Sequence, residues 1–448
     1  MRNCTIPAAL SAAALLFAGP AHAQSVVDFH NLKAREVRTT VFTVAAPQDF
    51  RVEAVGAEPS RDSGTFSWIH AMWRAKDDTP EPWIGNAWIL DTASRQVVWE
   101  LSAASTSRGD RHTRVFNGSV RLQPGTYEAF YASFPDQWVV GDGESGAGQR
   151  FISWLADQGF DQFRFTVQGA GHTLAGVEAD RARRQLETSA VVALHGDRGE
   201  RFAQTGFVLD RAADVEIYAA GEARENAEFD TGWIINADTR ETVWKLTWGG
   251  SAPAGGAVKN RLARLKKTLP AGRYAAFYAT DDSHDLSEWN APPPHDPEAW
   301  GLFLRVSDPA ARAAVKTFAY EHVPASAVIA AITKVHDDES LTRPFTLTRA
   351  MDVRVYALGE GSGSRLVDYG WIVNATGQKV WEMRYEDTEP AGGDAKNRLA
   401  DRTIRLEKGD YVLHYRTDDS HAYNEWNAAA PRDADRWGVT VLAAHGGR

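Results

Sequence analysis

The chain repeats itself, and this repetition constrains its fold more than any other feature. The segment FVLDRAADVEIYAAGE, from Phe207, matches FTLTRAMDVRVYALGE, from Phe345. The segments that follow also match, GWIINADTRETVW from Gly232 and GWIVNATGQKVW from Gly370, with one residue lost in the turn between two β-rich runs. A third and more diverged copy comes first, with FTVAAPQDFRVEAVGAE from Phe42. Self-similarity of this kind predicts a tandem array of like structural units.

Each copy is predicted to consist of β-strands. In DYVLHYRT, every second residue from Tyr411 to Tyr415 falls on one face, which is the period of two expected for a strand. The GWI…VW segments are two β-rich runs joined by a short polar link, the pattern of a β-hairpin. The skeleton L-x-x-G-x-Y-x-x-x-Y recurs in all three copies, at Leu122/Gly125/Tyr127/Tyr131, Leu269/Gly272/Tyr274/Tyr278 and Leu406/Gly409/Tyr411/Tyr415.

These patterns predict an all-β protein of three tandem antiparallel β-sandwich domains, jelly-roll-like and with little helix. The predicted domains are residues 24–172, 173–309 and 310–448. Short helices are expected near the joins, at 179–187 and 309–315. A propeller is disfavoured, because its blades run only about 40–50 residues.

The first 23 residues, MRNCTIPAALSAAALLFAGPAHA, are predicted to be a secretory signal peptide cleaved near Ala23. Their apolar stretch is shorter than the roughly 20 residues that a spanning helix needs. The single cysteine, Cys4, lies in this segment, so no disulfide is expected in the mature chain. The net charge of −10 opposes nonspecific binding to nucleic acid and anionic lipid. We therefore expect a periplasmic or secreted bacterial protein with no membrane span and no nucleic-acid partner.

At the level of this strand pattern, each copy resembles the bacterial pre-peptidase C-terminal type of β-sandwich. The points of likeness are an F-x-L strand, a V-x-V-x-A strand, a hairpin and an L-x-x-G-x-Y strand near the end. The resemblance implies noncatalytic modules of secreted hydrolases, some of which bind calcium or an extracellular polymer. The chain departs from that pattern in having no attached peptidase and in carrying an additional loop motif.

The additional motif is DDSHDLSEWN at 281–290, with a near copy, DDSHAYNEWN, at 418–427. It directly follows the strand of the second skeleton tyrosine. A second motif, Lys-Asn-Arg, accompanies it at 259–261 and 396–398, whereas the first copy lacks both motifs and has Arg-His-Thr-Arg at 111–114. Long loops without regular structure are often functional. The joint presence and joint absence of the two motifs predict that they touch in space.

Two interpretations of the loop concern its carboxylates. In the first, the loop is a structural clasp in which Lys259 and Arg261 pair with Asp281 and Asp282, and Trp289 and Trp300 pin the loop to the sandwich. In the second, the loop holds a hard cation, and calcium suits its oxygen-rich side chains better than zinc does. The candidate metal ligands are Asp281, Asp282, Glu288 and Asp296 in one copy, and Asp418, Asp419, Glu425 and Asp433 in the other.

Two further interpretations concern catalysis and ligand capture. A histidine beside carboxylates can act as a general base, but the chain has neither a G-x-S-x-G nor an H-E-x-x-H motif. Exposed aromatic side chains such as Trp289, Tyr423 and Trp426 can stack on sugar rings or on a partner protein. The candidate ligand-binding residues are Lys259, Arg261, His284, Trp289 and Asn290, and Lys396, Arg398, His421, Trp426 and Asn427.

Two equal loops in tandem favour binding over catalysis, because avidity grows with copy number. We therefore predict a noncatalytic binding or scaffolding protein of the cell envelope, with a protein or glycan partner and loops that are ion-pair clasps or calcium sites. The alternative is a secreted hydrolase that uses Asp, His and Glu of these loops. An insertion of the first copy, with Trp68, Trp73, Trp83, Asp77, Asp78 and Glu81, is a second candidate contact surface.

Overall fold

The computed structural model describes residues 25–58, 84–109, 112–134, 155, 159–199, 201–225, 227–238, 241–281, 283–286, 288–320, 328–428 and 430–444. The predicted signal peptide and the tryptophan-rich insertion of the first copy lie outside these residues. Within them the fold is all-β and every paired strand of a sheet is antiparallel to its neighbour, as the alternating pattern predicts. No helix of the described residues is long and apolar enough to cross a membrane.

The first stretch of chain, here called the first unit, forms two five-stranded sheets, ordered β1-β9-β3-β7-β6 and β10-β2-β8-β4-β5. Its strands are β1 (Ser25–His30), β2 (Val37–Val44), β3 (Gln48–Ala57), β4 (Asn86–Asp91), β5 (Gln96–Glu100), β6 (Ser107–Arg108), β7 (Thr113–Leu122), β8 (Gly125–Ala132), β9 (Arg164–Gln168) and β10 (Gly171–Leu174). The short helices η1 (Ala103–Ser105) and α4 (Phe160–Gln162) interrupt the loops.

The second unit repeats this topology in strands β11 to β20, which form two layers that join into one ten-stranded sheet through the β13–β14 pairing. Its strands are β11 (Val192–His195), β12 (Phe202–Leu209), β13 (Ala213–Arg224), β14 (Ala227–Asn236), β15 (Thr242–Lys245), β16 (Ala252–Pro253), β17 (Asn260–Leu269), β18 (Gly272–Ala279), β19 (Gly301–Val306) and β20 (Lys316–Phe318). The helix η3 (Pro297–Ala299) precedes β19.

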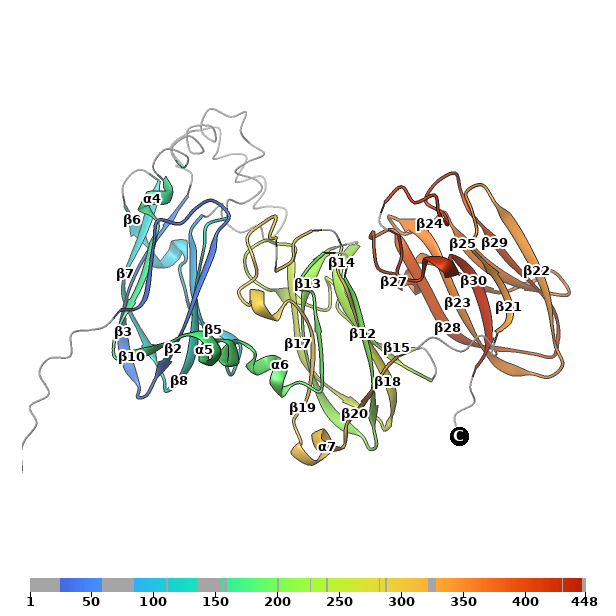
Figure 1. Cartoon of the computed structure of the whole chain (residues 1–448), viewed down its shortest axis with the longest axis horizontal. Helices are drawn as coiled ribbons and strands as arrows, with labels where there is room; N and C mark the ends of the chain where they lie inside the picture. The colour runs from blue at the N-terminus through green and yellow to red at the C-terminus, as the bar shows by residue number, and fades with distance from the viewer. Residues whose placement is uncertain are drawn as a thin grey trace, which may run out of the picture.

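The third unit has a six-stranded sheet, β21-β30-β23-β28-β27 with β24 beside β23, and a four-stranded sheet, β22-β29-β25-β26. Its strands are β21 (Val328–Thr333), β22 (Ser340–Leu347), β23 (Met351–Ser362), β24 (Arg365–Leu366), β25 (Tyr369–Asn374), β26 (Lys379–Glu382), β27 (Glu389–Pro390), β28 (Asn397–Leu406), β29 (Gly409–Arg416) and β30 (Gly438–Ala443), with helices η5 (Tyr385–Asp387) and η6 (Ala434–Arg436). Figure 1 shows the three units following one another in chain order.

Short helices lie in the connections between units. Helices α5 (Gly176–Arg183) and α6 (Gln185–Ser189) cover the first expected helical segment, and α7 (Pro309–Ala314) covers the second. Asp308 caps α7 by accepting from the backbone nitrogens of Ala310 and Ala311. The pairing of β10 with β2 and of β20 with β12 extends the sheets of the first two units slightly past the predicted limits at 172 and 309.

The two tyrosines of the repeated skeleton hold each sandwich together in the same way. The first tyrosine donates its hydroxyl to the carbonyl oxygen four residues earlier, as Tyr127 to Gln123 at 2.9 Å, Tyr274 to Pro270 at 2.9 Å and Tyr411 to Glu407 at 2.8 Å. The second tyrosine crosses the core to the opposite sheet and donates to a buried carbonyl, as Tyr131 to Val55, Tyr278 to Ala220 at 2.6 Å and Tyr415 to Leu358 at 2.6 Å. The skeleton is thus a pair of hydroxyl contacts that tie turn to strand and sheet to sheet.

Removal of one sheet-to-sheet hydroxyl, in Tyr415→Phe, is expected to lower the free energy of unfolding of the third unit by about 1–2 kcal/mol, because it leaves a buried carbonyl without its donor. Urea denaturation followed by tryptophan fluorescence measures this change. Tyr423→Phe, which removes a hydroxyl bonded to the exposed Asp435, is the control and is expected to leave the transition unchanged. Equal effects of the two substitutions would contradict the assigned role of Tyr415.

Candidate functional site: the DDSH loops and the joints between units

A buried histidine anchors each DDSH loop. In the second unit, His284 is completely buried, with Nε2 2.5 Å from Oδ1 of Asn260 and Nδ1 2.9 Å from Oδ1 of Asn290. The third unit repeats the arrangement, because His421 lies 2.7 Å from Asn397 and 2.9 Å from Asn427 through the same atoms. The ring therefore joins the loop at its own asparagine to the asparagine that begins the neighbouring strand.

Burial and a nearby lysine keep both imidazoles neutral at pH 7. They lower the pKa of His284 to about 3, with Lys259 as the cation, and the pKa of His421 to about 4, with Lys396 as the cation. A neutral ring donates through only one nitrogen, so it donates a hydrogen bond to one of its two asparagine oxygens. The backbone of both histidines has a positive φ, 64° and 62°, which places the ring inward at the tight turn of the loop.

The lysine of the Lys-Asn-Arg motif completes this network. Lys259 donates to Oδ1 of Asn290 and to Oε2 of Glu222 on β13, each at 2.9 Å. Lys396 likewise contacts Asn427 and lies 3.0 Å from Glu360 on β23. The predicted contact between the two motifs is therefore present, and Lys and Asn are the residues that make it.

The arginine of the motif does something else, which corrects the prediction that it pairs with the loop aspartates. Arg261 donates to Ser251 and to the carbonyl of Trp248, and its guanidinium lies 4.0 Å from the Trp248 ring centroid. Arg398 donates to Thr388 and lies 4.6 Å from the ring of Tyr385. The sheet register also gives the first unit an equivalent arginine, since Arg114 faces Gly56 as Arg261 faces Gly221. This arginine therefore does not depend on the loop.

Each loop rests on a buried aspartate that sequence reasoning missed. Asp230 accepts from the backbone nitrogen of Asp281 at 2.9 Å and from the indole nitrogen of Trp300 at 2.8 Å. Burial, together with the charge of Asp281, raises the pKa of Asp230 well above its usual value. The signal was available, because an aspartate stands two residues before the Gly-Trp pair in both copies that carry the loop, and the first copy has Gly85 there.

The third unit keeps this aspartate but leaves it less satisfied. Asp368 accepts from the backbone nitrogen of Asp418 at 2.9 Å. Three other buried atoms have no hydrogen bond within the described part of the chain: Oδ2 of Asp368, Oε2 of Glu360 and the indole nitrogen of Trp437. Oxygens of Glu360, Asp368 and Asp418 lie within 4.8 Å of one another. Burial and the charges of Asp418 and Glu360 raise the pKa of Asp368 to about 8.

The other predicted metal ligands that the structure describes lie apart from these clusters. Asp282 falls outside the described residues, and Glu288 and Asp419 are exposed. Glu425 accepts from the backbone nitrogen of Asp337 at 2.9 Å. Asp296 and Asp433 accept from the hydroxyls of Tyr218 and Tyr356, at 2.6 and 2.7 Å. Of the seven candidates that the structure describes, Asp281 and Asp418 are the two that it brings beside the strand carboxylates.

The tryptophans of the loop pack around the histidine. Trp289 and Trp300 meet edge to face at a centroid distance of 5.3 Å, and both contact His284 in the same manner. Trp289 is 7% exposed and Trp300 1%. The third unit repeats the corner with Trp426 and Trp437 at 5.0 Å. In the second unit these rings are thus covered.

The first unit covers the corner of the second unit. Trp88 on β4 and Phe130 on β8 stack at 5.1 Å on the outer face of their sheet and belong to one apolar cluster with Trp289 and Trp300. The Trp88 indole donates to the carbonyl of His295 at 2.7 Å. The DDSH loop therefore forms an edge of the second unit on which the outer sheet face of the first unit packs.

A buried ion pair completes this first joint. The guanidinium of Arg95, from the turn between β4 and β5, holds both carboxylate oxygens of Asp296, and both side chains are almost completely buried. His295 also lies 3.0 Å from Glu100 of the first unit. Asp296, which the sequence suggested as a metal ligand, is thus an ion-pair partner across the joint.

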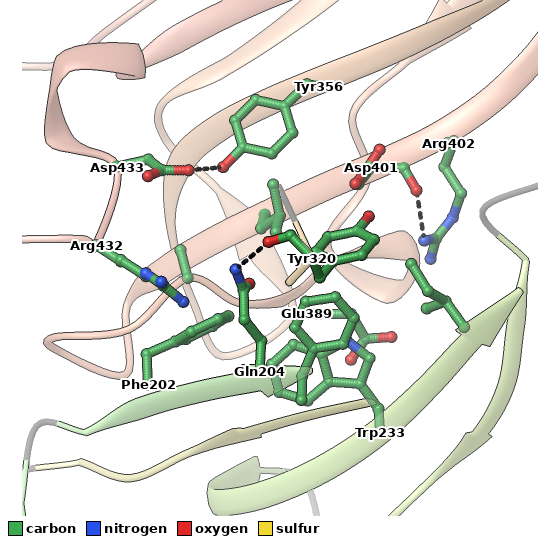
Figure 2. Close-up of a pocket in the computed structure, with 14 residues that line it drawn as sticks. Phe202, Gln204, Trp233, Tyr320, Tyr356, Glu389, Asp401, Arg402, Arg432 and Asp433 are labelled. Carbon is green, nitrogen blue, oxygen red and sulfur yellow. Dashed lines mark hydrogen bonds between the residues drawn. The ribbon is translucent and has the colours of Figure 1, made fainter. Parts of the chain in front are cut away.

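The second joint uses equivalent surfaces but is less tightly closed. Trp233 and Phe277 of the second unit stack at 5.1 Å and face the third unit across a narrow cleft (Figure 2). Figure 2 shows Phe202 and Trp233 on one side of the cleft, and Arg432 and Asp433 on the other. Arg432 lies 5.1 Å from the Phe202 ring, and Lys245 pairs with Glu389 at 2.9 Å. The free space admits only a few water molecules.

Comparison with protein-family models and with curated proteins found no match to this chain. The interpretation of the site consequently depends on its own geometry.

The raised pKa of Asp368 predicts a stability that falls as pH rises. Between about pH 4 and pH 8 the folded carboxyl holds a proton that the unfolded chain has released, so folding stability decreases over this window. We expect the melting temperature of the third unit to fall from pH 5 to pH 8, as measured by calorimetry. In Asp368→Asn, which cannot ionise, the decline should become shallower. A melting temperature with the same pH dependence in both proteins would show that Asp368 titrates normally.

Proposed function

We propose that this chain is a noncatalytic, exported scaffolding protein in which the DDSH loops order the joints between consecutive β-sandwich units. The observation that carries the proposal is the first joint, where the Trp88–Phe130 face packs on the Trp289–Trp300 corner and Arg95 meets Asp296 in a buried pair. An apolar contact combined with a buried ion pair fixes the orientation of two units more strongly than a flexible linker does. The loop has one task in this proposal, which is to present that corner.

The distribution of the loop among the units supports the same function. The second and third units carry the loop, and each follows a unit whose stacked aromatic pair faces it. In the first unit the positions of Glu222 and Asp230 are occupied by Ala57 and Gly85. The loop and its strand carboxylates therefore occur together where one unit meets the preceding one.

The burial of the histidines argues against the hydrolase alternative. His284 and His421 are completely buried, and both nitrogens of each ring face asparagine oxygens. A general base must come within hydrogen-bond reach of the proton that it removes. A substrate would have to displace the loop asparagines and the tryptophan corner to reach either ring. A scaffold needs no such opening, and its partner at the cell envelope would be a protein or a glycan.

A calcium site in the third unit is the second candidate function. Three carboxylates, Glu360, Asp368 and Asp418, converge within 4.8 Å, and Lys396 is the one cation with a contact to them within the described part of the chain. Oδ2 of Asp368 and Oε2 of Glu360 are buried and accept no hydrogen bond from the residues that the structure describes. Calcium takes oxygen ligands of this kind, and carbonyl oxygens and water would have to supply the remaining ligands.

The joint is tested by breaking its ion pair. In Asp296→Asn, Arg95 keeps its buried charge but loses its hydrogen-bonded counter-charge, and a broken buried pair typically costs about 3–5 kcal/mol. We expect the first unit to separate from the second, seen as a larger radius of gyration in small-angle X-ray scattering. Asp238→Asn, which removes the exposed partner of Arg273, is the matched control and should leave the radius unchanged. An unchanged radius in Asp296→Asn would contradict the scaffolding proposal.

The calcium candidate is tested at two pH values, because only an ionised cluster attracts the cation. At pH 8.5, 2 mM calcium chloride is expected to raise the melting temperature of the third unit relative to EDTA, and a concentration of about 100 times Kd would stabilise it by about 2.7 kcal/mol. At pH 5 the effect should vanish, since Asp368 is protonated. Asp418→Asn should abolish the effect at pH 8.5. No response of the wild-type protein at pH 8.5 would exclude the site.

A further inference from the structure

The outer sheet faces of the three units carry the same aromatic pair. Trp88 lies opposite Phe130, Trp233 opposite Phe277 and Trp371 opposite His414, in the same register of the same two strands. The three pairs stack at 5.1, 5.1 and 4.8 Å, with interplanar angles of 11°, 9° and 5°. The repeat has therefore preserved the geometry of the face, although the second ring of the third pair is a histidine.

The faces differ in what covers them. Trp88 and Phe130 are each 1% exposed, under the loop edge of the second unit. Trp233 and Phe277 are 2% and 5% exposed, at the joint with the third unit. Trp371 and His414 remain partly exposed, and no residue of another unit contacts them within the described chain. In Figure 1, β22 and β29 of this sheet lie on the side of the third unit that is away from the second unit.

We propose that the outer face of β22, β29, β25 and β26 binds the loop edge of a separate β-sandwich protein, an edge of the kind that the second and third units present. The inference rests on the proposed function. The face continues the series of two joints in which the same aromatic pair packs on such an edge. It is therefore expected to recognise the same chemistry, an apolar corner with a tryptophan and an adjacent carboxylate.

The charges of the face support a carboxylate on the partner. Arg416 occupies the position of Ala132 and Ala279, and its guanidinium lies 4.7 Å from the ring of Tyr369, beside Trp371. In the first joint a face arginine, Arg95, takes the edge carboxylate of Asp296. Arg416 lies at the other end of the paired strands from the position of Arg95, so the acidic side chain that it binds would stand elsewhere on the partner's edge than Asp296 does in the first joint.

The occupant is a different protein because both described loop edges of this chain lie at its internal joints, the third through Arg432 and Asp433. The edge of the second unit is covered by the first unit, and the edge of the third unit faces the second. A copy of the chain offers its own edge only if an internal joint opens. This property gives a direct test, since the edge of the second unit can be freed by substitution and used as the probe.

The probe is the full chain with Trp88→Asp, Arg95→Ala and Trp371→Ala, which frees the edge of the second unit and removes the face of the third. Mixed with wild-type chain, it should form a 1:1 complex in sedimentation velocity. The interaction should weaken by about tenfold or more when the wild-type partner carries Trp371→Ala, as for a central aromatic residue of an interface. Val328→Ala, an exposed apolar position on the other sheet, is the control and should bind as wild type does.

The outcomes separate this inference from the function on which it rests. An enlarged probe by X-ray scattering that still forms no complex at 100 µM would show that the face is a solvent-facing end of the array, and would overturn the inference alone. A probe of unchanged size would contradict the scaffolding function.

If circular dichroism shows the probe to be unfolded, Arg95→Glu with Trp371→Ala replaces it, because the introduced carboxylate would repel Asp296 and leave the sandwich face intact. Quenching of Trp371 fluorescence by soluble glycan oligosaccharides, without protein binding, would also overturn the inference.

Discussion

A buried imidazole held between two asparagine side chains is the contact on which the loops and the joints depend. It links the loop to the start of the neighbouring strand through Asn260 in one unit and Asn397 in the other. The indole rings of the tryptophan corner pack edge to face on this imidazole. A polar network in a dry interior is stable only when its members find partners, since each unpaired group costs about 1–3 kcal/mol. The lysine, the two asparagines and the imidazole satisfy this requirement together, which favours a single arrangement of the loop.

The regular part of the fold could be predicted from the sequence because it is encoded locally. Period-two alternation located the strands, the GWI…VW runs located the hairpins β14–β15 and β25–β26, and the skeleton tyrosines marked a strand of the core. Comparison of the three copies with one another also predicted the contact between the Lys-Asn-Arg motif and the loop. Lys259 and Asn260 make this contact. These inferences needed only residue spacing and the presence or absence of motifs in the copies.

The rest of the site depends on register between segments that are distant in the sequence. Asp230 and Glu222 become neighbours of Asp281 only because β13 and β14 pair beside the strand that leads into the loop. The role of the arginine was mistaken for the same reason, since Arg261, two residues from the lysine of the network, turns to backbone carbonyls. The joints themselves could not be predicted from the outer tryptophans, because the sequence of a stacked pair on a strand face is the same whether a neighbouring unit or solvent covers it.

The second and third units each carry both a face and an edge, and this arrangement has a consequence for how such a chain can lengthen. A duplicated unit brings with it both halves of a joint, so its edge fits the face before it and its face fits the edge after it. Growth of the array then requires no new interface, only the preservation of an old one. The differences among the three stacked pairs would in that case record where each copy stands in the series, with His414 and Arg416 on the face that no unit of the described chain covers.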